Sequence, residues 1–236
     1  MSEYNAYQNN NELSFNEYLS KVFITLALGL GITTFTSLIF TMFYERMAVA
    51  LGGLFFYGVI GVCIAEIVIA IVMGARLQKM AKSTMWALYI VYSILTGISL
   101  SGIIGMYTAA SVWIAFAVTT IMFISMAIIG QTTKVDLSRF SGLILPGLIG
   151  LIVATLVNVF FFRSDFFQWI ITYVGVVMFL FLIAYDMQML RNYYNGSFAD
   201  EEMGEKLMIM AAFQLYLDFI NLFIRILRLF GKRSND

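Results

Sequence analysis

The stretch Leu207–Phe230, LMIMAAFQLYLDFINLFIRILRLF, decides the fold because it combines membrane length with polar side chains at helical spacing. Gln214, Asp218, Asn221 and Arg225 fall at i, i+4, i+7 and i+11, which places them along one face of a helix. A carboxylate at bilayer depth costs roughly 2.5–3.5 kcal/mol on insertion scales, so this face should avoid lipid. The pattern predicts a helix near the centre of a membrane bundle.

The composition of the whole chain is that of an integral membrane protein. Of 236 residues, 61% are hydrophobic and 12% are charged, against about a quarter charged in soluble domains. About 20 apolar residues cross a hydrocarbon core roughly 30 Å thick. On that measure seven segments qualify as transmembrane helices, at approximately 21–43, 51–74, 84–106, 111–130, 140–162, 167–190 and 206–230. We therefore predict an all-α integral membrane protein.

Several classes of chemistry are disfavoured by the composition. The formal net charge is zero, so bulk charge gives no reason to expect a nucleic-acid partner. The chain has no histidine, which removes Ser-His and Cys-His nucleophilic pairs and histidine metal sites. Cys63 is the only cysteine, so no intrachain disulfide is expected. We expect neither an enzyme nor a bound cofactor.

Basic residues predict the orientation of the first six helices, because Lys and Arg accumulate in cytoplasmic loops. Eight of them fall on one side with the N-terminus, and two, Arg46 and Arg163, fall on the other. The eight are Lys21, Arg76, Lys79, Lys82, Lys134, Arg139, Arg191 and Lys206. The prediction is a cytoplasmic N-terminus.

The end of the seventh segment does not follow this rule. Seven crossings place the C-terminus outside, yet Arg225, Arg228, Lys232 and Arg233 cluster there. One interpretation is that the first six helices dictate the topology, and the other is a seventh segment that re-enters and returns to the cytoplasm. We favour seven crossings because the segment contains no Gly or Pro at which to turn back.

Three parts of the chain are expected. Residues 1–19 form a polar tail, residues 20–230 a single transmembrane domain, and residues 231–236 a short C-terminal tail. Within the third segment Ser93, Gly97, Ser101 and Gly105 repeat every four residues. Such a small-residue ridge lets a neighbouring helix approach closely, so we predict tight helix packing there.

Two carboxylates in consecutive helices are the strongest candidates for chemistry. Asp186 lies near the cytoplasmic end of the sixth segment, and Asp218 lies about 12 residues into the seventh. If they meet in a partly dry site, both cannot ionise cheaply, so the pair shares a proton and forms a pH-sensitive clasp between the two helices. The alternative is that Asp186 is an interfacial residue and that Asp218 is a structural partner of Arg225 or Asn221.

Further polar groups extend this set without deciding its role. Hard cations such as calcium prefer oxygen ligands. Five side chains offer such oxygens and would serve a proton path equally well, namely Asp186, Asp218, Asn221, Gln214 and Glu66. Glu66, Gln214, Asn221 and Arg225 are thus candidate pore-lining residues, although a buried hydrogen-bonded carboxyl explains Glu66 equally well. Arg76 is a candidate partner of Asp186, and a cytoplasmic anchor is the simpler reading of it.

Four motifs together resemble the Bax inhibitor family, the membrane proteins with the transmembrane Bax inhibitor motif. They are Leu215-Tyr216-Leu217-Asp218-Phe219-Ile220-Asn221-Leu222-Phe223, Ala184-Tyr185-Asp186, Leu95-Thr96-Gly97-Ile98-Ser99-Leu100-Ser101 and the loop 132–138. The resemblance covers roughly residues 20–230 and favours a bacterial member. One departure from the family pattern is the long acidic connection 192–205, which bears on how the two aspartates approach each other.

The resemblance implies a fold of two three-helix layers around a central C-terminal helix. It also implies a pH-sensitive calcium leak gated by an aspartyl pair, which by motif is Asp186 and Asp218, with Arg76 as the candidate latch arginine. Calcium would be the transported ion, transiently bound by the pair. The expected location is the bacterial inner membrane.

Two other functions stay open at this point. One is a non-conducting membrane regulator of stress, cell death or a membrane protease, which acts by binding a membrane-protein partner. The other is a proton-coupled cation exchanger.

Overall fold

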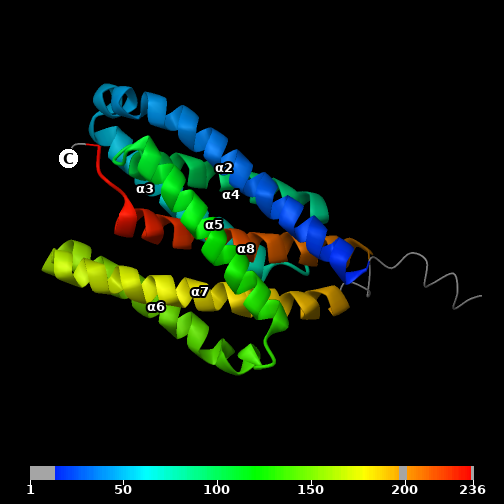
Figure 1. Cartoon of the computed structure of the whole chain (residues 1–236). Coiled ribbons are helices and arrows are strands. Elements are labelled where there is room, and N and C mark those ends of the chain that lie inside the picture. Colours follow the sequence, from blue (N-terminus) through cyan, green and yellow to red (C-terminus); the bar gives the residue numbers. More distant parts are fainter. Residues whose placement is uncertain (1–13, 197–200, 235–236) are drawn as a thin grey trace, which may run out of the picture. The chain divides into compact units, whose positions relative to one another are not determined.

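The computed structural model describes residues 14–196 and 201–234, and these residues fold into long helices without a β-strand (Figure 1). The elements are α2 (Phe15–Leu51), α3 (Gly53–Ala75), α4 (Lys82–Ile104), α5 (Ala109–Thr132), η1 (Leu137–Phe140), α6 (Ser141–Val157), η2 (Asn158–Phe162), α7 (Asp165–Gly196) and α8 (Glu201–Phe230). Seven spans in this part of the chain are long and apolar enough to cross a membrane. The prediction of an all-α protein with seven transmembrane helices is confirmed.

The seven spans differ sharply in burial. In α8, 67% of the most apolar 18-residue window is buried, whereas the corresponding share is 0% in α3 and 39% in the α7 span. Helix α8 is also unbroken from Glu201 to Phe230, as expected for a segment without Gly or Pro in its apolar part. The layered arrangement implied by the resemblance and the side on which each terminus lies stay predictions.

Helix α2 begins earlier than the apolar pattern suggested. Ser14 and Glu17 form a capping box, in which the Ser14 hydroxyl accepts a hydrogen bond from the Glu17 amide and the Glu17 carboxylate accepts one from the Ser14 amide. The first helix therefore starts at Phe15, inside the predicted polar tail 1–19. The rest of that tail, residues 1–13, lies outside the described residues.

The fifth predicted segment, 140–162, is a composite of three elements. The 3-10 turn η1 precedes α6, and a π-helical turn, η2, ends the span at Arg163, which has a left-handed backbone with φ 47°. Asp136 caps η1 by accepting a hydrogen bond from the Ser138 amide at 3.0 Å. Hydrogen bonds from the Ser138 side chain and backbone lower the pKa of Asp136, so this cap is a carboxylate at neutral pH.

The contacts of the chain define two compact units. Of the described residues, unit 1 comprises 14–102, 190–196 and 201–213, and unit 2 comprises 103–189 and 214–234, so α7 and α8 each contribute to both. The sequence predicts one domain over residues 20–230, without this division.

Within unit 1, the small-residue ridge on α4 packs against α2. Thr33 donates a hydrogen bond to the Ser93 carbonyl at 2.9 Å. A Cβ atom added to Gly97 would lie 2.8 Å from the Thr33 carbonyl oxygen and 2.6 Å from Thr36 Cβ, so only glycine fits. The predicted close approach is confirmed for Ser93, Gly97 and Ser101, whereas Gly105 is exposed.

The acidic connection predicted at 192–205 is mostly helical, which corrects the expectation of a long link. Helix α7 continues to Gly196 and α8 begins at Glu201, which leaves residues 197–200 outside the described part of the chain. The acidic residues at the start of α8 pair with lysines and so favour the helix rather than a charged loop.

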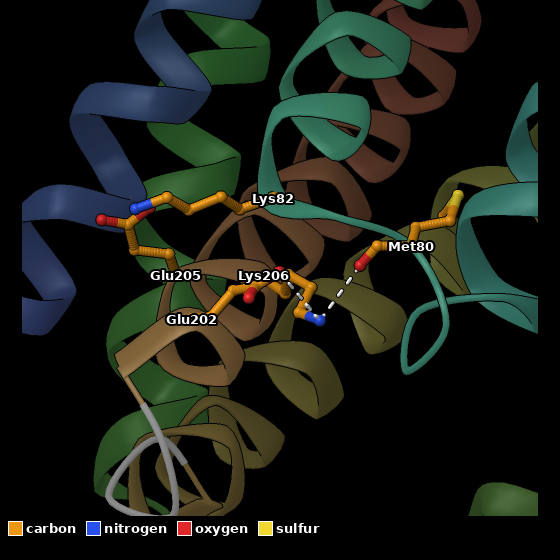
Figure 2. A network of polar contacts seen from close by, with 5 residues as sticks. All are labelled: Met80, Lys82, Glu202, Glu205 and Lys206. Carbon is orange, nitrogen blue, oxygen red and sulfur yellow. Dashed lines mark hydrogen bonds and ion pairs between the residues drawn. The ribbon is translucent and has the colours of Figure 1, made fainter.

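Figure 2 shows this network at the start of α8. Lys206 is 6% exposed. Its Nζ donates to the Met80 carbonyl at 3.0 Å and lies 3.5 Å from the Glu202 carboxylate. Lys82 and Glu205, both partly exposed, pair at 3.1 Å. The connection between α3 and α4 is thereby fastened to the first turns of α8 within unit 1.

Replacing Lys206 by methionine should lower the free energy of unfolding by about 1–3 kcal/mol, because the Met80 carbonyl loses its buried donor while the apolar stem is kept. The matched change Lys82→Met removes a partly exposed ion pair and should cost less than about 1 kcal/mol. Thermal unfolding of both variants in detergent measures the difference. Equal loss of stability in the two would show that the buried lysine has no special role.

Candidate functional site

Within unit 2 the structure brings Asp186 of α7 and Asp218 of α8 together. Asp218 is 5% exposed and Asp186 is partly buried. The two carboxyl groups lie within reach of each other's charge and of a hydrogen bond between them. A hydrogen bond between two carboxyl groups needs a donor, so one of the two must carry a proton when that bond is made.

Aromatic side chains pack around the residue that follows the buried Asp218. On α8 the next residue, Phe219, packs against Phe116 and Phe123 of α5, with ring centroids 5.5 Å and 5.6 Å apart. One oxygen of Asp218, Oδ2, is buried without a hydrogen-bond partner among the described residues. Two negative charges in such surroundings are costly, which favours a shared proton over two ionised groups.

Helix α5 also fixes the backbone of α7 beside the pair. A Cβ atom added to Gly130 of α5 would lie 2.8 Å from the Cα of Ala184 and would overlap its carbonyl oxygen. Ala184 precedes Asp186 by two residues. The missing side chain of Gly130 therefore permits the helix contact that holds Asp186 in place.

Gln188, two residues after Asp186, anchors the connection between α5 and α6. Its Nε2 donates to the Val135 carbonyl at 2.9 Å, and its Oε1 accepts from the Leu137 amide at 2.7 Å. Gln188 is not among the site residues predicted from the sequence. Its position two residues after the motif Ala184-Tyr185-Asp186 was the available signal, since the loop 132–138 belonged to the resemblance as well.

Arg225 lies on the same helix as Asp218 but contacts α7 instead. Its guanidinium donates to the Ile171 carbonyl at 3.3 Å and lies 5.2 Å from the centre of the Phe179 ring. Gly175 leaves room for it, since an added Cβ would overlap the guanidinium. Within residues 14–196 and 201–234 no ion pair joins Arg225 to Asp218, so the structure does not support the alternative that Asp218 is a structural partner of Arg225.

The other two polar groups of the α8 face have different surroundings. Asn221 donates to the carbonyl of Leu217 in its own helix at 2.8 Å, so the structure does not pair its amide group with Asp218. Gln214 is partly buried one turn before Asp218. Their roles as pore-lining residues stay predictions.

Glu66 and Arg76 lie in unit 1. Glu66 accepts a hydrogen bond from the Ser99 hydroxyl of α4 at 3.2 Å, which agrees with the reading of a hydrogen-bonded carboxyl. Arg76 is exposed at the C-cap of α3. The latch role of Arg76 and the pore-lining role of Glu66 are still predictions.

The carboxyl pair is not part of a larger metal cluster in the described part of the chain. No group of three or more His, Cys, Asp or Glu side chains is placed there to hold a metal ion. Calcium usually takes six to eight oxygen ligands. The two carboxyl groups by themselves supply at most about four.

Comparison with known proteins shows the family of the chain. The family model described as "Inhibitor of apoptosis-promoting Bax1" matches residues 15–235. The chain belongs to the Bax inhibitor family.

Among the relatives of this Bax inhibitor family protein is "Inner membrane protein YbhL" of Escherichia coli strain K12, which is 40% identical over 220 residues and 92% of each chain. An uncharacterised protein of Rickettsia prowazekii is 36% identical, over 92% of this chain and 90% of its own. One from Borreliella burgdorferi is 34% identical over 94% of both chains. The chain is an integral membrane protein, similar to one of an inner membrane.

Proposed function

We propose that this protein is a pH-sensitive calcium leak of a bacterial inner membrane, gated by protonation of Asp186 and Asp218. The observation that carries the proposal is the close approach of the two carboxyl groups at a place where Asp218 is buried. The interaction energy between the two carboxyl groups changes with each proton that the pair gains or loses.

The proposed gate works as a clasp between α7 and α8. With one proton, the pair makes a strong charge-assisted hydrogen bond across the two helices. Removal of that proton leaves two negative charges that repel, and a second proton removes the charge that strengthens the bond. Flux should therefore vary with pH, because protonation changes the force that holds α7 against α8.

Calcium is the proposed cargo and no cofactor is needed in this scheme. When the pair is ionised, its oxygens are the hard ligands that calcium prefers, and they bind the ion only in transit. The orientation in this proposal has the N-terminus in the cytoplasm, as the distribution of basic residues predicts.

Calcium flux into liposomes that contain the purified protein tests this function. Across about pH 6 to pH 8, flux should exceed that of empty liposomes and should change by up to about tenfold per pH unit, the limit for control by one proton. Passive flux down the gradient indicates a leak, whereas saturable countertransport of protons would indicate an exchanger. Absence of flux from folded protein would overturn the leak in favour of a non-conducting regulator that binds a membrane-protein partner.

A further inference from the structure

A second polar site lies in unit 2, where α7 begins and α8 ends. It is a pocket of about 350 Å³, and the residues that line it include Tyr107, Asp165, Gln168, Arg228 and Arg233. This volume is near the lower limit for small-molecule sites, so the pocket suits a small polar group. None of these five residues belongs to the carboxyl pair.

The C-terminal segment after α8 helps to build the pocket. Residues 231–234, part of the predicted C-terminal tail 231–236, bond to the connection between α4 and α5. The Thr108 amide donates to the Lys232 carbonyl and the Ser234 amide donates to the Met106 carbonyl, each at 3.0 Å. Tyr107 and Arg233 pair between these two bonds. The backbone at Arg233 is therefore fixed beside the start of α5.

Three exposed charged side chains line the pocket. Within residues 14–196 and 201–234, Arg228, Arg233 and Asp165 enter no ion pair, although all three line the same space. An anion at this site would meet two guanidinium groups suited to phosphate.

A buried donor without a partner lies beside the pocket. Gln168 lines the pocket, and its Nε2 is buried without a hydrogen-bond partner in the described part of the chain. The side chain is held by Asn158, whose Nδ2 donates to Gln168 Oε1 at 3.2 Å. Buried donors without partners are rare, so this turn of α7 beside the pocket is not fully satisfied within the described part of the chain.

The position of the pocket points to the membrane surface. Asp165 begins one span and Arg228 lies in the last turn of another, so both lie at headgroup depth when these spans cross the bilayer. Phe166, next to Asp165, is 76% exposed, and Trp169, which lines the pocket, is 46% exposed. Acyl chains can lie against these rings while a headgroup occupies the pocket.

We propose that this pocket binds a phosphoethanolamine group, with Arg228 and Arg233 on the phosphate and Asp165 on the ammonium. The carboxylate of Asp165 favours this headgroup over a purely anionic one, because it attracts the ammonium group. The group can be supplied by phosphatidylethanolamine in the bilayer or by soluble phosphoethanolamine, and the location at the membrane surface favours the lipid.

Native mass spectrometry of the purified full chain, in micelles with equal amounts of phosphatidylethanolamine and phosphatidylglycerol, tests the proposal. The double variant Arg228→Gln/Arg233→Gln should retain phosphatidylethanolamine about tenfold less than the parent. Lys232→Gln is the matched control, because it removes an exposed positive charge from the same segment without touching the pocket. It should bind like the parent.

Two further arms separate the outcomes. Asp165→Asn should lower the preference for phosphatidylethanolamine over phosphatidylglycerol and keep phosphate binding, and an unchanged preference would overturn the ammonium assignment. Binding of soluble phosphoethanolamine that depends on both arginines, without lipid retention, would support the pocket with a soluble ligand. Parent-like binding of both ligands by the folded double variant would overturn the proposal.

Discussion

Replacing Asp218 by asparagine should remove most of the pH dependence of calcium flux. The amide keeps the size of the carboxyl and can donate a hydrogen bond to Asp186, but it does not ionise. The pair then loses the shared proton that we propose as the switch, because the remaining carboxylate has a neutral neighbour. Asp186→Asn should also reduce the pH dependence, because each of the two residues supplies one of the coupled carboxyl groups.

The double variant Asp186→Asn/Asp218→Asn should show no pH dependence at all, where the parent changes by up to about tenfold per pH unit. Flux in liposomes at several pH values measures both effects. Glu66→Gln is the matched control, because it neutralises another carboxyl within a membrane span, one that bonds to Ser99 in unit 1. Loss of pH dependence in that control, with an unchanged response in the aspartate variants, would move the sensor to Glu66.

Periodicity predicted the polar face of α8, but it did not predict which partner each group would find. The spacing put Asp218 and Arg225 on one face, and their pairing was a reasonable alternative. In the structure Arg225 bonds to Ile171 of α7, beside Gly175, which leaves space for it. The partner of Arg225 depends on which residue of α7 lies opposite it. A single sequence does not show how two helices are aligned against each other.

Contacts between distant parts of the chain were the least predictable. Lys206 and Met80 are separated by 126 residues, and the lysine had been assigned only to positive charge on the cytoplasmic side. The pocket likewise depends on Arg233, which pairs with Tyr107 across the ends of two other helices. Each contact uses a backbone carbonyl or an extended segment, for which hydrophobic periodicity carries no information.

Replacing Gly130 by alanine should destabilise unit 2 and disturb the carboxyl pair at once. The added methyl group would meet the backbone of Ala184, which cannot rotate away as a side chain can. Helix α5 must then move from α7, at a cost of at least about 1–3 kcal/mol. Since Phe116 and Phe123 of the same helix pack on Phe219, the shift reaches both helices that carry the aspartates.

Gly150→Ala is the matched control for this change, because an added Cβ at Gly150 of α6 meets no atom within 4 Å. Alanine also favours a helix over glycine by about 1 kcal/mol, so the control should be neutral or stabilising. Thermal unfolding in detergent compares the two variants, and flux at several pH values shows whether the pair still responds. A Gly130→Ala variant as stable as Gly150→Ala would mean that α5 and α7 separate without cost, and the rigid support of Asp186 by α5 would then be wrong.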